Sequence, residues 1–178
     1  LYYMHYRDQL VLTGEINNVG EPIMVNVGKS FRTGIELNGN IQLVRHLTWD
    51  VSGTFSINKI KDFTEYVDDY DADWNFTGQT ATFLGTTDLS FSPDILATSL
   101  LTYQPFGGFS CSLRSSYIGR QYIDNTTTRD RSLDPAFVNG LMIGYTFSLK
   151  PFREIGISLI INNLFSEKYE TSAWVYRY

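Results

Sequence analysis

The sequence has little of what several functional classes need. Cys111 is the single cysteine in 178 residues, which excludes an internal disulfide and a cysteine-rich metal site. Fourteen Lys and Arg against 19 Asp and Glu give a net charge of −5, so the basic field that attracts nucleic acid is missing. No apolar run approaches the ~18 residues of a membrane helix. We therefore expect neither a nucleic-acid partner nor a transmembrane helix.

Aromatic residues, in contrast, are abundant. The chain has 12 tyrosines, 12 phenylalanines and three tryptophans, and 43% of its residues are hydrophobic, which excludes a disordered chain. Its length suits one domain or part of one. Because it opens on Leu1, with neither Met nor a signal-like segment, we expect a piece of a longer protein.

Alternation of apolar and polar residues is the main pattern. Between Leu47 and Ile57 every odd position is apolar or glycine and every even position is polar. Similar alternation starts near residues 31, 109, 137 and 155, and less regular strands run over 2–12 and 89–103. This predicts an all-β antiparallel meander of about seven strands, with an eighth starting near Ser172. Several strands alternate for a dozen residues, the length that a tilted strand needs to cross a bilayer (~9–11 residues plus flanks).

The predicted connections alternate between short and long. Tight turns fall at 44–46, 104–108 and 150–153, whereas 13–27, 61–88 and 124–135 are long. This asymmetry is typical of outer-membrane barrels, which have short periplasmic turns and long extracellular loops. Aromatic residues also gather at strand ends, as an interfacial girdle would: Tyr103, Phe106, Phe109, Phe147 and Phe152. A soluble barrel or sandwich would alternate too, with its apolar face inward, but the strand lengths and loops favour the membrane barrel.

Seven strands cannot close such a barrel, which needs an even number of at least eight. The polar face also carries charges that suit a wet lumen: Arg32, Glu36, Asp50, Arg114 and Arg120. We expect residues 1–178 to be a segment of a wide transmembrane barrel, with the other strands and any lumen-filling domain N-terminal to Leu1. A closing strand would follow Tyr178.

Three stretches resemble one protein family. Asn163-Leu164-Phe165, followed by Tyr169, resembles the Asn-Leu-Phe-x-x-x-Tyr signature near the C-terminus of TonB-dependent outer-membrane receptors. Residues 26–36, which end in Gly-Ile-Glu, and residues 92–105, which end in Tyr-x-Pro, are similar to two further strands of that family. The resemblance is greatest to members from Bacteroidetes-type bacteria.

The resemblance implies a 22-stranded barrel of which this chain forms the C-terminal part, without the plug domain. It implies outer-membrane active transport of a scarce nutrient, most often an iron–siderophore complex, energised by TonB through the plug. Cobalamin, haem and glycans are alternative cargoes, and an adhesin, an enzyme or a passive pore on a non-TonB barrel is an alternative function. The implied partners are TonB, outer-membrane lipid and a small chelate, with no cofactor and no covalent chemistry. Only 14 residues follow Leu164, too few for a loop and the closing strand.

The acidic segment after Lys61 is the main candidate for ligand contacts. It places six acids within residues 62–73, interleaved with aromatics. We expect ligand contacts in this loop and in the lumen at Tyr66, Asp68, Asp69, Tyr70, Trp74, Arg114 and Arg120. The alternatives are a merely solvated loop and arginines that pair with nearby acids. The spacing of Asp69, Asp71 and Asp73 suits the oxygen ligands of calcium. Trp74 and Thr80 replace the required Gly and Glu, which excludes an EF-hand and leaves an irregular Ca²⁺ site as an alternative.

Other motifs predict little chemistry. Gly28-Lys29-Ser30 lacks the first glycine and the following helix of a phosphate loop. His5 and His46 fall on different strands, so a shared metal site is not expected. Cys111 shares the apolar register of its strand and is expected to face lipid as a small hydrophobic residue. No serine, histidine and acid combine into a catalytic triad.

Overall fold

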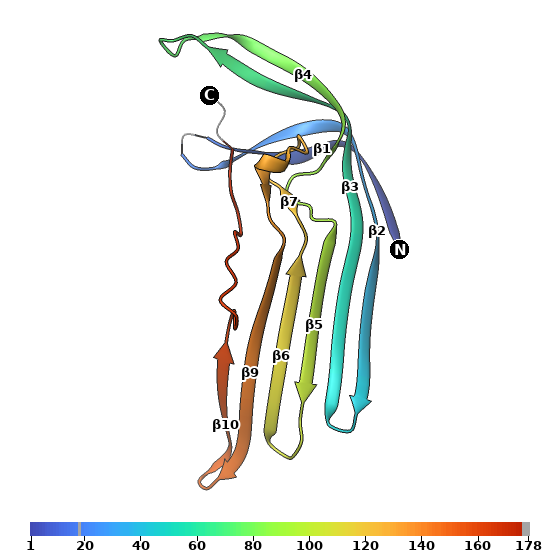
Figure 1. Cartoon of the computed structure of the whole chain (residues 1–178), viewed down its shortest axis with the longest axis vertical. Helices are drawn as coiled ribbons and strands as arrows, with labels where there is room; N and C mark the ends of the chain where they lie inside the picture. Colours follow the sequence, from blue (N-terminus) through green and yellow to red (C-terminus); the bar gives the residue numbers. More distant parts are fainter. Residues whose placement is uncertain (18, 176–178) are drawn as a thin grey trace.

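A computed structural model describes residues 1–17 and 19–175 (Figure 1). The chain is almost entirely strands, and its elements in order are β1 (Tyr2–Ile16), β2 (Pro22–Val44), β3 (Leu47–Tyr70), β4 (Phe76–Asp88), β5 (Ile95–Tyr103), β6 (Phe109–Ile118), β7 (Gln121–Tyr122), the 3-10 turn η1 (Arg129–Arg131), β8 (Ser132–Leu133), β9 (Ala136–Leu149) and β10 (Phe152–Ile161). Within the described part of the chain, no helix is long and apolar enough to cross a membrane.

The main sheet is an antiparallel meander. Its strands lie in the order β1-β2-β3-β5-β6-β9-β10, and β4 pairs with the far half of β3. The near half of β3, Leu47–Phe55, pairs with β5, and its far half, from Lys59 to Tyr70, pairs with β4. The chain returns from β4 to β5 through residues 89–94, where the Leu89 amide donates to the Asn58 carbonyl. Figure 1 shows the result, a curved sheet with tight turns at one end and bent hairpins at the other.

The register places the alternating residues on two distinct faces. Cα partners share a face in an antiparallel pair, and β2 and β3 stay in register from Lys29 to Gln42 without a bulge. One face lines a hollow of about 850 Å³ and includes Asn40, Asp50 and Arg114. The other face is apolar but exposed, with Leu37 at 59% and Ile57 at 52% exposure. An apolar face turned outward fits the expected membrane-barrel segment, because a soluble barrel keeps its apolar face inward.

Three polar side chains interrupt the outer apolar face. Ser99, Ser115 and Asn139 are register neighbours on β5, β6 and β9. Their hydrogen bonds are local, because Trp49 Nε1 donates to Ser99 Oγ (2.8 Å) and Ser115 Oγ donates to Asn139 Oδ1 (2.6 Å). Polar groups next to lipid need such partners, so these pairs make the interruption tolerable and explain why alternation is weak in this part of the sequence.

Two predicted loops are instead strand hairpins, and one predicted strand is shortened. The connection expected over 13–27 is reduced to a turn between Ile16 and Pro22, and most of 61–88 is strand. The outer parts of these hairpins are exposed on both faces, so they lack the alternation that marks a strand with one apolar face. The strand expected from Leu89 begins at Ile95. No strand begins near Ser172 in the part of the chain that ends at Val175, and Tyr178 lies outside the described residues.

The outer parts of β1 and β3 bend where the backbone enters the left-handed region. Asp8 has φ 52° and Asp62 has φ 56°, and the β3–β4 register shifts beside Asp62. Gly14 has φ 85°, and a Cβ there would lie 2.7 Å from the Ile123 carbonyl oxygen. Glycine is therefore required where the β1–β2 hairpin meets the loop between β7 and β8.

The Asn163-Leu164-Phe165 motif ends β10 with a defined turn. Asn163 has φ 51°, and its side chain bonds both backbone groups of Glu167, accepting from the amide (2.8 Å) and donating to the carbonyl (2.9 Å). The Leu164 amide donates to the Asn139 carbonyl (2.7 Å), which extends the ladder to β9. Beyond this turn the chain runs back to β1, where the Val175 amide donates to Gly14.

Candidate ligand-binding surface

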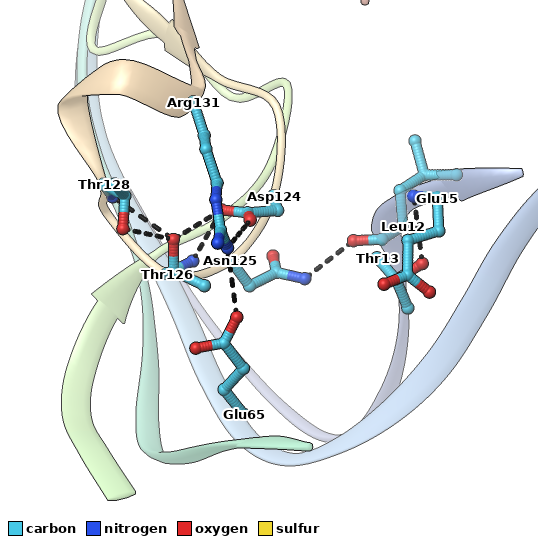
Figure 2. Close-up of polar contacts among 9 residues, drawn as sticks. All are labelled: Leu12, Thr13, Glu15, Glu65, Asp124, Asn125, Thr126, Thr128 and Arg131. Carbon is cyan, nitrogen blue, oxygen red and sulfur yellow. Dashed lines mark hydrogen bonds and ion pairs between the residues drawn. The ribbon is translucent and has the colours of Figure 1, made fainter. Parts of the chain in front are cut away.

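A buried polar network anchors the loop between β7 and β8 at the hairpin end of the sheet (Figure 2). The Asp124 side chain is almost fully buried, and its Oδ1 accepts hydrogen bonds from the Thr126 amide (3.0 Å) and hydroxyl (2.7 Å). Arg131 Nη1 lies 3.0 Å from Asp124 Oδ2 and 3.1 Å from Glu65 Oε1 of β3. Partial burial opposes the charge, but the bonds to Asp124 and Glu65 prevail and raise the pKa of Arg131. The buried Asp124 carboxylate is thus paired with Arg131, and Arg131 links it to Glu65 of β3.

Asn125 continues this network to β1. Its Nδ2 donates to the Leu12 carbonyl (2.7 Å), and its Oδ1 accepts from the Ser90 amide (2.9 Å). Ser90 Oγ donates to the same Leu12 carbonyl (2.8 Å). Because Asn125 and Ser90 are both buried, the network fixes the β1–β2 hairpin, the β4–β5 connection and the β7–β8 loop relative to one another. A second hollow of about 300 Å³ lies beside it, lined in part by Glu15, Tyr66 and Asn125.

The β3–β4 hairpin carries a cluster of exposed aromatics at its tip. The ring centroids of Tyr70 and Trp74 are 6.4 Å apart, and those of Tyr70 and Phe76 are 6.1 Å apart. Trp74 remains 68% exposed. A hollow of about 350 Å³ beside these rings includes Asp68 in its lining. Exposed rings with carboxylates beside them can pack on a flat organic ligand and meet cationic or metal-bearing groups.

The acids of this hairpin mainly hold its own backbone and side chains. Asp71 Oδ1 accepts from the amides of Asp73 (2.9 Å) and Asn75 (2.8 Å), and the Asn75 amide is the main cause that lowers the pKa of Asp71. Asp68 accepts from the Gln79 side chain across the hairpin (2.7 Å). Asp69 likewise accepts from the Thr80 hydroxyl (2.8 Å).

These contacts bear on the calcium alternative. Among the described residues, which include the whole β3–β4 hairpin, no three His, Cys, Asp or Glu side chains converge on one point. The Asp71 carboxylate is committed to the turn, and Asp69 is bonded to Thr80. The spacing of Asp69, Asp71 and Asp73 therefore reflects a turn, and no calcium site is assembled from it.

The two predicted lumen arginines have different surroundings. Arg114 lies on the concave face in one register row with Leu100 and Asp50, two strand spacings or about 10 Å from Asp50. Among the described residues it forms no ion pair, and it is exposed. Arg120 instead lies beyond the end of β6, where it bonds Ser132 Oγ and Asp134 Oδ1 (both 2.8 Å). Arg120 therefore pairs with a nearby acid, which is the alternative given for the arginines, and its contact with a ligand stays a prediction.

The sequence pattern did not predict the buried network. Asp124, Asn125 and Arg131 fell in a segment expected to be only a connection. The run Asp-Asn-Thr-Thr-Thr from Asp124 was a signal for a hydrogen-bonded turn. Burial of its first two side chains depends on contacts with β1 and β3, which are distant in sequence. Of the other motifs, His46 occupies a turn with φ 82°, and Cys111 pairs with Tyr103 and Ile143 on the outer face, as expected.

Comparison with known proteins agrees with this architecture. The family model described as "TonB dependent receptor-like, beta-barrel" matches residues 1–164. The siderophore receptor PiuA from Acinetobacter baumannii has a similar structure, with a TM-score of 0.64 and 18% identity over 97% of this chain. A mutant of the ferric enterobactin receptor PfeA from Pseudomonas aeruginosa has a TM-score of 0.54 and 18% identity over 92% of the chain. No curated protein is significantly similar in sequence.

This chain spans 22% of the length of each of those two receptor structures. The outward apolar face, the tight turns at one end and the hairpins at the other fit the same barrel. The matched structures are those of receptors. The chain therefore belongs to the TonB-dependent receptor β-barrel family, whose members reside in the bacterial outer membrane.

Proposed function

We propose that the protein containing this chain imports an iron–siderophore complex across the outer membrane, energised by TonB through a plug domain. The observation that carries the proposal is the fold, which is shared with two siderophore receptors over at least 92% of the chain. In this role residues 1–178 are the C-terminal part of the barrel. The transport itself requires no covalent chemistry and no resident cofactor from this chain.

Within this function, the aromatic tip of β3–β4 is the site of first contact. Tyr66, Tyr70 and Trp74 offer apolar rings outside the membrane, and Asp68 and Asp69 add negative charge beside them. Such rings bind the organic shell of a chelate without needing a particular metal geometry.

Arg114 then provides a positive charge on the concave face, further along the path to the periplasm. An arginine that forms no ion pair with the described residues of this chain can attract an anion in a water-filled lumen. Many siderophore complexes are anionic, so a charge at this position favours their passage toward the plug.

Ligand titration of the full-length receptor tests the proposal. Quenching of Trp fluorescence is followed with ferric siderophores, haem, cobalamin and oligosaccharides. A ferric siderophore is expected to bind, and Trp74→Ala is expected to weaken its binding by about 5–30-fold, the loss of a typical aromatic contact. Because this variant removes a fluorophore, its affinity is measured by calorimetry.

The matched control is Phe83→Ala, since Phe83 lies on the same hairpin, is also 68% exposed and is absent from the tip cluster. This variant is expected to bind as the wild type does. Binding of only haem, cobalamin or a glycan would refute the siderophore assignment. Equal effects of both variants would refute the role of the tip. Arg114→Gln is expected to reduce uptake of an anionic ferric complex with little effect on its first binding.

A further inference from the structure

Three basic residues form a row on the outer face of β1, β2 and β3. Arg7 is the Cα partner of Lys29, and Lys29 is the Cα partner of Lys61. All three are exposed, and within the described residues none forms an ion pair. Like charges directly opposite each other on neighbouring strands are destabilising. A counter-charge would therefore stabilise the row, and the described residues supply no ion pair to it.

The height of the row relative to the membrane follows from the strand geometry. A residue adds about 2.5 Å of height in a strand tilted by about 40°. The apolar stretch of β3 from Leu47 to Ile57 then spans about 25 Å, the height of a barrel's lipid-facing band. Lys61 lies four residues further, about 10 Å beyond that band. This is the level of lipid headgroups at the extracellular surface.

The surface directly below the row is suited to a lipid. Phe31 and Tyr3 are stacked with ring centroids 6.2 Å apart, and Lys61 Nζ lies 5.5 Å from the Phe31 ring centroid. His5 and Lys59 occupy the same register row as Phe31, and Lys59 is already paired with Asp88 at 2.5 Å. Basic residues above aromatics and an apolar face combine contacts for a phosphate, for the interface and for acyl chains.

Two acids lie close to the row in sequence. Asp8 and Asp62 directly follow Arg7 and Lys61, and both occupy left-handed positions where β1 and β3 bend. Neither forms an ion pair with the row. The row thus stays net positive at the bend between the membrane-spanning part of the sheet and the hairpins.

We propose that Arg7, Lys29 and Lys61 bind the phosphate groups of an anionic lipid in the outer leaflet, whose acyl chains lie along the outer apolar face. The attraction between basic clusters and anionic headgroups supplies the affinity. The bound phosphates offset the repulsion among the three cations and brace β1, β2 and β3 where they bend. Arg7, Lys29 and Lys61 share the outer face by register, although Lys61 also borders the hollow beside Tyr66. The proposal does not depend on which nutrient the receptor imports.

The test uses the full-length receptor purified from outer membranes and inserted into nanodiscs. Native mass spectrometry measures retained phosphorylated lipid, and titration with phosphorylated outer-leaflet glycolipid measures affinity against a zwitterionic lipid background. The variant R7Q/K29Q/K61Q removes the row. The matched control R45Q/K150Q/R153Q removes three exposed charges from the tight-turn end.

The wild type and the control variant are expected to retain the lipid. The row variant is expected to bind it roughly 100-fold more weakly, since each basic residue near an anionic surface contributes about fivefold. If the triple variant fails to assemble, Lys29→Gln alone is expected to weaken binding about fivefold. Equal retention by all variants would overturn the proposal. So would an equal loss in the control, or inorganic phosphate alone binding as tightly as the lipid.

Discussion

A charge placed on the outer face of β3 should damage assembly far more than the same charge one residue later. Val51 lies on the outer face opposite Gly39 and Ser99, whereas Ser52 lies on the concave face opposite Asn38 and Thr98. At about 2.5 Å of height per residue, Val51 is about 10 Å above Leu47 and about 15 Å below Ile57. It is therefore close to the middle of the lipid-facing band.

An arginine on the lipid-facing side of a strand, near the bilayer midplane, destabilises the folded barrel by roughly 2–4 kcal/mol. Val51→Arg is therefore expected to shift the folding equilibrium by roughly 30- to 1,000-fold, whereas Ser52→Arg meets water in the lumen and should fold nearly as the wild type does. Urea titration of the full-length receptor in vesicles measures the difference, and heat-modified mobility in gels reports assembly in cells. Val51→Leu is the control for size. Equal tolerance of arginine at 51 and 52 would refute the assignment of faces.

Three further perturbations test local features. Arg131→Gln leaves the buried Asp124 without its cation, so residues 124–135 should become about 1–3 kcal/mol easier to open, as measured by hydrogen exchange; unchanged protection would contradict the anchoring role. Trp49→Phe leaves Ser99 Oγ without a donor beside lipid and should lower the free energy of unfolding by about 1 kcal/mol in urea titrations, with Tyr103→Phe as an unaffected control. The pKa of Asp71 is lowered from its ordinary value of 3.8, so its ionised carboxylate stabilises the hairpin tip at any pH above that value. This contribution is lost as the pH falls through the lower pKa of the folded state. Amide exchange at the tip should therefore accelerate in acid, and Asp71→Asn should remove that pH dependence.

The membrane-spanning part of the fold was predictable from sequence because one face of each strand must be apolar. The alternation from Leu47 to Ile57 and the tight turns at 44–46, 104–108 and 150–153 have direct counterparts in the sheet. The hairpins were not predictable from this pattern. Asp68 and Gln79 face each other on strands that are wetted on both sides, so hydrogen bonding and not burial holds them in register.

The candidate site was predictable only in part. The exposed aromatics of the tip followed from composition, since Tyr70 and Trp74 stand out in an acidic segment. The roles of the acids did not follow, because a carboxylate that caps a turn, as Asp71 does, has the same spacing as one that binds a cation. The burial of Asp124 and Asn125 depends on Leu12, Ser90 and Glu65, and such long-range contacts leave no local pattern.

The central claim is that the odd-numbered face of this sheet meets lipid and the even-numbered face meets water. It is tested by nitroxide labels at neighbouring positions of the full-length receptor in bilayers, after Cys111→Ser removes the thiol of this chain. Labels at residues 37 and 159 should collide mainly with lipid-soluble oxygen, and labels at 38 and 158 mainly with a water-soluble nickel complex. The reverse order, or no difference between neighbours, would contradict the account.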